Sequence, residues 1–358
     1  QKISKNNLVA FLSLGFYVLW QPYFDGNGLW FDLALAPIFL LIFYFLYQKE
    51  FFWAGLFWGL ALLVKQTAFW LIFPIILSWW IFSHKKRSLA VFALAALILP
   101  VLTLVIFGGL GIFGNFYFWA VKFGMTVLPK APGQVEYPAI KQVLSLLIPF
   151  VFVFPAIFDF RKSKIAPVLI FWTIFASLGV FPRWSLFHFQ PALPFLVLIS
   201  GSFLVQIKKG RWWVVYLILV ILGTVYLQGR FYRLNWQKPT RFFEPETLAA
   251  GQWLKENTTP GEKIFILNSW DHLYALSGTL PAVKPWVPIL PWYLNYPGIQ
   301  EEMVKDLKET QPRFIVFEPY KETGLGSYRP KLIADYIGLH YSLKEVVAGR
   351  FLILVKIL

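Results

Sequence analysis

The sequence lacks cysteine altogether and has few acidic residues, 18 among 358. Without cysteine there is no disulfide, no thiolate metal site and no cysteine nucleophile. It also contains no Gly-rich phosphate loop ending in Lys-Ser/Thr, no His-Glu-x-x-His and no Gly-x-Ser-x-Gly. Charged residues make up only 14% of the chain and apolar residues 58%, against about 25% and about 45–50% in ordinary soluble domains. These shortages exclude disordered and collagen-like chains and most soluble enzymes.

Long uncharged apolar runs fill the first two thirds of the chain, and they predict a polytopic α-helical membrane protein. Several are shorter than the roughly 20 residues that cross a bilayer, so flanking residues extend them or some segments are re-entrant. Nine candidate spans can be marked: 8–20, 33–47, 51–64, 67–82, 89–107, 143–158, 165–181, 192–207 and 212–227.

The positive charge of the chain is concentrated in this membrane part. Residues 1–228 contain 17 Lys and Arg against 5 Asp and Glu, whereas residues 229–358 contain 16 against 13. The basic residues form short clusters between apolar runs, which does not suit nucleic acid. If successive spans cross the membrane in opposite directions, the loops on one side carry twelve Lys and Arg residues. The short loops on the other side carry five. The positive-inside rule then predicts a multi-pass protein of the plasma membrane (the inner membrane of bacteria) with a cytoplasmic visible N-terminus and an extracytoplasmic tail.

The tail from residue 229 has an ordinary composition and predicts a small α/β domain at 229–358, after the membrane domain at 1–228. Helices are predicted near 244–256 and 299–309, and strands at 263–267, 313–317 and 350–355. Asp271, His272 and Tyr274 follow a strand end, where they either contact an acceptor or simply occupy a loop.

Only five acids precede the tail, and ionisable residues near membrane depth usually face a cavity. Glu50 and Asp159 adjoin cytoplasmic basic residues and are interpreted as solvated loop charges, while Glu136 is left unassigned. Asp25 and Asp32 lie where one span ends and the next begins. Asp25 either caps a Gly/Asn turn or binds substrate, and Asp32 is either a helix N-cap or a functional group.

Basic and polar residues gather at the same predicted outer side. Lys65 interrupts the apolar stretch 53–82, where it either binds phosphate or extends to the membrane interface. Arg183, His188 and Gln190 stand among aromatic residues, where they either bind a phosphate or sugar or belong to an aromatic belt. The aromatic segment 113–123 predicts an interfacial helix, a lid or part of a lipid-access groove.

Several ordered segments carry a family resemblance. They are Phe31-Asp32-Leu33, the run from Gly55 to Thr67, the run from Arg183 to Pro194, and, in the tail, residues 249–254, 260–264 and 311–316. Together they resemble the polytopic GT-C glycosyltransferases, in particular the branch of protein O-mannosyltransferases and lipid A aminoarabinose transferases.

The resemblance implies inverting transfer of a sugar from a polyprenyl-phosphate donor to a protein, lipid or glycan acceptor on the outer membrane face. It implies that the donor phosphate is held by Lys65 and Arg183, with His188 and Gln190 as further candidates, and that Asp32 and Asp25 position substrate. The family's main catalytic acid lies in an earlier loop, so we expect an N-terminal truncation with that acid upstream of Gln1. No cofactor is expected, and a divalent cation is possible but not required, since cations already face the phosphate.

Two other functions fit the same pattern. A transporter or flippase of lipid-linked saccharides also needs many spans with ionisable residues, although it would place polar groups near the midplane and carry an internal repeat. A carrier-binding membrane protein without enzymatic activity is the other alternative, because the tail could bind a partner.

Overall fold

The computed structural model divides the chain into two compact units, Gln1–Trp236 and Gln237–Leu358. The boundary predicted after residue 228 lies inside a helix of the first unit. Described residues are 3, 6–26, 30–130, 135, 137–151, 165–181, 184–207, 213–236, 243–284, 287–320, 325–326 and 328–357.

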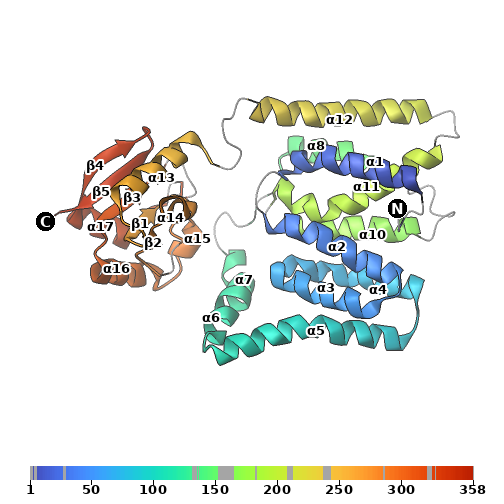
Figure 1. Ribbon diagram of the computed structural model, residues 1–358, viewed down its shortest axis with the longest axis horizontal. Helices are drawn as coiled ribbons and strands as arrows, with labels where there is room; N and C mark the ends of the chain where they lie inside the picture. Colours follow the sequence, from blue (N-terminus) through green and yellow to red (C-terminus); the bar gives the residue numbers. More distant parts are fainter. Residues whose placement is uncertain are drawn as a thin grey trace. The chain divides into compact units, whose positions relative to one another are not determined.

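The first unit is a bundle of apolar helices (Figure 1). Its α-helices are α1 (Asn7–Trp20), α2 (Phe31–Tyr47), α3 (Phe51–Val64), α4 (Ile72–Phe82), α5 (Lys86–Gly109), α6 (Phe113–Tyr117), α7 (Phe123–Thr126), α8 (Ile140–Val151), α10 (Ile165–Ser177), α11 (Leu193–Ile207) and α12 (Trp213–Asn235). Shorter helical turns are η1 (Gln21–Phe24), η2 (Gln66–Leu71), η3 (Phe118–Lys122), η4 (Leu128–Lys130), η5 (Leu178–Val180) and η6 (Leu186–Ala192).

Each predicted apolar run overlaps one of these helices, because in an apolar medium a helix satisfies its own backbone hydrogen bonds; of the run 143–158, residues 152–158 lie outside the described residues. Among the described residues, three helices are long and apolar enough to cross a membrane: Lys86–Gly109, Leu186–Val205 and Val214–Arg233. Four shorter apolar helices accompany them. The chain is therefore a membrane protein, while the number of nine spans stays a prediction.

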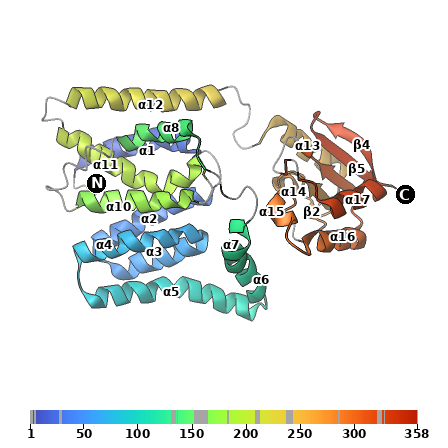
Figure 2. The same cartoon turned by 180° about the vertical axis from the view of Figure 1, so that it is seen from behind.

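The order of packing is visible in Figures 1 and 2. Helices α1, α10 and α11 lie together, α2 and α3 follow on one side, and α5 covers the outer side of α3. Gly55 and Gly59 permit this close approach, because a Cβ atom at either position would overlap the carbonyl oxygen of Phe92 or Ala96 on α5. The α3–α5 contact is thus a contact of backbone against backbone.

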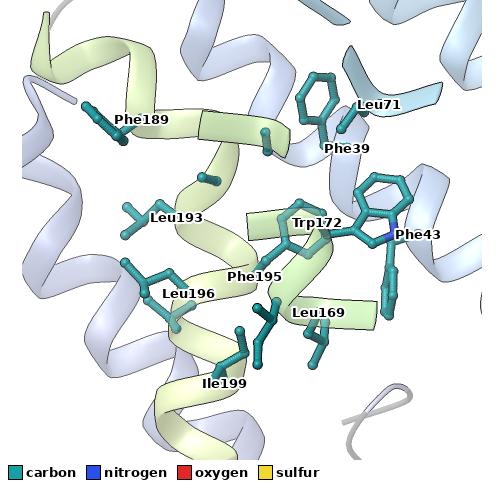
Figure 3. Packing of buried hydrophobic residues seen from close by; sticks show 14 of the residues in the cluster. Phe39, Phe43, Leu71, Leu169, Trp172, Phe189, Leu193, Phe195, Leu196 and Ile199 are labelled. Carbon is teal, nitrogen blue, oxygen red and sulfur yellow. The ribbon is translucent and has the colours of Figure 1, made fainter. Parts of the chain in front are cut away.

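Aromatic side chains fill the centre of the bundle (Figure 3). Trp172 packs on Phe195 with ring centroids 5.1 Å apart and meets Phe43 edge-on at 5.6 Å. Its indole N–H donates to the Ser78 hydroxyl at 2.9 Å, so this buried polar atom is satisfied. The core joins α2, α4, α10 and α11 and fixes the ends of these helices relative to one another.

The second unit is a five-stranded sheet with the strand order β2-β1-β3-β5-β4. Its strands are β1 (Lys263–Leu267), β2 (Leu280–Pro281), β3 (Phe314–Phe317), β4 (Tyr341–Val347) and β5 (Phe351–Lys356). Strand β1 is parallel to β2 and β3, whereas β5 is antiparallel to both β3 and β4.

Helices cover both faces of this sheet, as the alternation along β1 requires. Ile264 and Ile266 face α13 (Pro245–Asn257) and α14 (His272–Ser277). Phe265 and Leu267 face the other layer. That layer contains α15 (Pro291–Leu294), α16 (Ile299–Thr310) and α17 (Lys331–His340). The unit is the small α/β fold that the tail sequence predicts.

Candidate functional site

Three of the predicted site residues meet at one end of the helix bundle. Lys65 Nζ lies 2.7 Å from Asp32 Oδ1, 2.6 Å from Asp32 Oδ2 and 2.9 Å from His188 Nδ1. His188 Nδ1 also lies 3.2 Å from Asp32 Oδ2. Asp32, Lys65 and His188 are called the charged cluster below.

Each member of the charged cluster sits where an apolar helix begins or ends. Asp32 is in the first turn of α2. Lys65 ends α3 by adopting an extended conformation, with φ −159° and ψ 130°, before the chain enters η2. His188 belongs to η6, which leads directly into α11. The Trp58 indole N–H donates to the Ala68 carbonyl at 3.0 Å and secures the turn that carries Lys65.

The charged cluster is a desolvated ion pair with an imidazole beside it. The Asp32 side chain is 3% exposed, whereas those of Lys65 and His188 are 19% and 13% exposed. The Lys65 ammonium has three donors, enough for both carboxylate oxygens and the Nδ1 lone pair of a neutral imidazole. In the tautomer whose Nδ1 accepts this bond, the ring hydrogen is on Nε2.

This arrangement gives the lysine a fixed position and an accessible side. Asp32 holds the ammonium in one place, and the partial exposure of Lys65 and His188 lets an anionic ligand approach the same two groups. A phosphate oxygen would take the place of one of the three acceptors around the Lys65 ammonium and could accept a second hydrogen bond from the imidazole, and such charge-assisted bonds are stronger than neutral ones. The geometry therefore suits an anion held between two donors.

Gln190 joins η6 to η1. It is fully buried, and its amide nitrogen donates to the carbonyls of Gln21 at 3.0 Å and Phe24 at 2.8 Å. Its Oε1 atom has no hydrogen-bond partner in the part of the chain that the structure describes. Both amide hydrogens are used in these two bonds, and a role of Gln190 in binding phosphate stays a prediction. We assign it the role of holding η1 against η6.

The remaining predicted residues lie outside the charged cluster or outside the described residues. Asp25 caps η1 in a left-handed conformation, with φ 54°, is exposed, and interacts electrostatically with Arg230 of α12. Arg183, predicted to bind the donor phosphate, and Glu136, which is left unassigned, fall outside the described residues.

The aromatic segment after α5 is helical and touches the turn beside Lys65. It consists of α6, a π-helical turn at η3, and α7. Gln66, the residue after Lys65, donates its side-chain amide to the Ala120 carbonyl at 3.0 Å. This bond attaches the segment to the turn that carries the lysine.

A groove of about 710 Å³ opens between α1, α2 and α11. On α2 its lining residues run along one face from Leu33, the neighbour of Asp32, to Tyr44. These positions span eleven residues, or about 16 Å of helix at 1.5 Å per residue. The lining is mainly apolar, including Leu40, Val197 and Leu198. The groove is therefore an apolar channel whose lining on α2 starts at the residue after Asp32, while the members of the charged cluster are not among its lining residues.

Sequence reasoning missed an aromatic contact next to the charged cluster. Trp30 stacks on Phe187, with ring centroids 4.1 Å apart and planes 5° apart. The only sequence signal is that each ring stands within two residues of a cluster member, Asp32 or His188. Aromatic residues are so frequent in this chain that such proximity could not be distinguished from an aromatic belt.

No group of three or more His, Asp or Glu side chains that could hold a metal ion occurs among the residues that the structure describes. In the second unit, Asp271 and His272 mark the start of α14, and Tyr274 is buried within it. Burial lowers the pKa of His272 below its ordinary value of 6.5, against the opposing charges of Asp271 and Glu244. The imidazole, which packs on Phe243, is therefore held mainly in its neutral form.

Comparison with known proteins finds little similarity. No protein-family model matches the chain, and no curated protein matches it. Among solved structures, the crystal structure of the Archaeoglobus fulgidus oligosaccharyltransferase, a complex with zinc and sulfate, matches 91% of the chain with 14% identity and a TM-score of 0.39. The chain covers 48% of the length of that protein. A similarity of this size supports no functional argument, so the function must be inferred from the site.

Proposed function

We propose that this protein is a GT-C-type membrane glycosyltransferase that takes a sugar from a polyprenyl-phosphate donor. The observation that carries the proposal is the charged cluster, in which Asp32 fixes the Lys65 ammonium beside His188 at the ends of three apolar segments. The acceptor is a protein, a lipid or a glycan on the outer face of the inner membrane, and transfer inverts the anomeric centre.

The chemistry of transfer needs positive charge where the donor phosphate departs. Breaking the anomeric C–O bond develops positive charge on the sugar and leaves a pair of electrons on the phosphate oxygen. Lys65 and the Nε2–H of His188 would stabilise that oxygen in a site where water is partly excluded. Asp32 positions Lys65 and partly offsets its charge, so the phosphate is released after transfer. No residue of this chain is assigned the role of general base toward the acceptor hydroxyl.

The groove supports a donor with a lipid tail. It is apolar, it begins at Leu33 beside Asp32, and it follows α2 toward the opposite end of the bundle. A ligand with an anionic head and an apolar chain would place its phosphate at Lys65 and its tail among the groove residues. A soluble nucleotide sugar has no chemical group that matches such a channel.

The proposed orientation places the charged cluster outside. The turns that carry Asp32, Lys65 and His188 are those that the charge bias of the loops assigns to the outer face. Their meeting in one cluster supports placing the three turns on the same side of the membrane, and the choice of the outer side rests on the charge bias alone.

The test compares Lys65→Met with Lys49→Met in membranes that contain the full protein. Lys49 is an exposed lysine at the other end of α2 and serves as the matched control. We expect Lys65→Met to lower transfer of radiolabelled sugar from a polyprenyl-phosphate donor by about 10²–10³-fold, the loss typical of one transition-state donor. Lys49→Met should keep wild-type transfer.

Two outcomes would reject the proposal. If Lys65→Met transfers sugar at the wild-type rate but blocks export of lipid-linked saccharide, the protein is a transporter. If wild-type membranes bind the carrier and no transfer is detected with any donor, the protein is a carrier-binding protein without glycosyltransferase activity.

A further inference from the structure

The stacked pair of Trp30 and Phe187 is built by the fold from two distant segments. Trp30 precedes α2, and Phe187 lies in η6, yet the two ring planes differ by only 5° at a centroid distance of 4.1 Å. Parallel stacking with an offset is one of the two arrangements that aromatic pairs prefer. By comparison, exposed Trp80 contacts His84 within its own helical end, as an interfacial side chain does.

The stack continues directly into the charged cluster. The Phe187 ring lies 4.1 Å from the imidazole ring of His188, which in turn lies 3.2 Å from the Asp32 carboxylate. These contacts thus connect the Trp30 indole, through Phe187 and His188, to the Asp32 carboxylate. Apolar ring faces occupy one end of this series of contacts, and hydrogen-bonding groups occupy the other.

Among the residues that the structure describes, Trp30 keeps a large exposed surface. Phe187 covers one face of the indole, and 43% of the Trp30 residue is exposed although it stands beside the nearly fully buried Asp32. An exposed indole surface next to hydrogen-bonding groups matches the two sides of a sugar. A pyranose ring presents an apolar face of C–H groups, which packs on aromatic rings, and hydroxyls, which form hydrogen bonds with polar groups such as the partly exposed His188 imidazole.

We propose that the face of the Trp30 indole opposite Phe187 is the platform on which the pyranose ring of the donor stacks, with Phe187 as the support that fixes the indole. The inference rests on the proposed function and adds a residue that binds the sugar, in contrast to Lys65, which binds the phosphate. Because every pyranose has a C–H face, the platform increases affinity for hexoses in general and leaves selection among them to the hydroxyl contacts.

The experiment measures the contribution of the sugar to binding affinity separately from the contributions of the phosphate and the alkyl tail. The full protein in lipid nanodiscs is titrated with dodecyl phosphate and with dodecyl phosphate esterified to mannose, glucose or galactose. We expect the wild type to bind the best of these sugar esters about tenfold more tightly than dodecyl phosphate, the size of one good aromatic contact. Trp30→Ala should abolish the tenfold preference for the sugar ester over dodecyl phosphate. Its affinity for dodecyl phosphate should differ from that of the wild type by less than about twofold, well under one tenfold step. Trp30→Phe should retain most of the ratio, and Trp80→Ala should retain all of it.

A second measurement does not depend on phosphate binding. Saturation-transfer NMR with methyl β-D-glucopyranoside should show signal at the ring C–H protons for the wild type and loss of that signal for Trp30→Ala. The platform is rejected if Trp30→Ala keeps both the affinity ratio and the NMR signal, or if Trp30→Ala weakens dodecyl phosphate as much as the sugar esters. If dodecyl phosphate fails to bind while the NMR signal depends on Trp30, the platform holds and the lipid-phosphate donor is rejected.

Discussion

At the scale of single residues, the sequence identifies candidate groups but not the pairs that they form. Asp32, Lys65 and His188 stand out because each interrupts or borders an apolar run. Their contacts join positions 33, 123 and 156 residues apart, and no local periodicity encodes such distances. The same limit explains Gln190, whose partners on η1 lie more than 160 residues away.

Gln190→Leu tests the structural role of that side chain. The substitution removes the Gln190 donor from the buried Phe24 carbonyl, whereas the Gln21 carbonyl still accepts from the backbone N–H of Gly26 at 3.1 Å. An unsatisfied buried polar group costs about 1–3 kcal/mol, so we expect the free energy of unfolding of the first unit to fall by that amount. Thermal unfolding in detergent, followed by tryptophan fluorescence, measures the change.

Gln252→Leu is the control for this prediction. Gln252 is exposed on α13 and donates only to Glu256, one turn along the same helix. Its loss should change stability by less than about 0.5 kcal/mol. Equal effects of the two substitutions would contradict the assigned role of Gln190.

At the scale of elements, the hydrophobic pattern predicts where a buried helix or strand lies better than it predicts exposed strands or irregular turns. The predicted strands 263–267, 313–317 and 350–355 agree with β1, β3 and β5 to within a residue, because each is a short buried apolar run. Strand β4 was not predicted, since five of its seven residues are exposed and polar or charged residues interrupt it. The π-helical turn at η3 also has no signal in the aromatic pattern.

Gly55→Ala tests the backbone contact between α3 and α5. In an exposed helix, Gly→Ala raises stability by about 0.5–1 kcal/mol, because alanine loses less backbone entropy on folding. At Gly55 the new Cβ would overlap the Phe92 carbonyl oxygen. We therefore expect the opposite sign, a loss of about 1–3 kcal/mol from forced separation of the helices, measured by the same unfolding assay.

The matched substitution is Gly108→Ala, near the end of α5, where a Cβ would meet no atom within 4 Å. It should be neutral or stabilising. A stabilising Gly55→Ala would show that α3 and α5 do not pack as closely as described here.

At the scale of the whole molecule, the charge bias of the loops predicts the orientation of both units. The absence of native cysteine makes this directly measurable, because any introduced cysteine is the sole thiol of the 358 residues. In intact cells, we expect a membrane-impermeant maleimide to label Lys130→Cys and Lys308→Cys. Lys49→Cys should react only after permeabilisation. All three positions are exposed in the structure.

The reverse labelling pattern would place the charged cluster on the cytoplasmic side and contradict the proposed outer-face reaction. If Lys130→Cys is labelled and Lys308→Cys is not, the chain crosses the membrane an odd number of times between these two positions, instead of the four times predicted.

The position of the Asp32–Lys65 pair also bears on how the nascent chain enters the membrane. The two residues stand at the start of α2 and immediately after α3, so the hairpin formed by these consecutive helices brings the acid and the base to one end. An isolated acidic side chain makes partition of a helix into lipid costly. A hairpin that carries its own counter-ion can leave the translocation channel as a neutral unit, before His188 or any later segment has been synthesised. The pair proposed to hold the donor phosphate would thus also lower the cost of moving the α2–α3 hairpin into lipid.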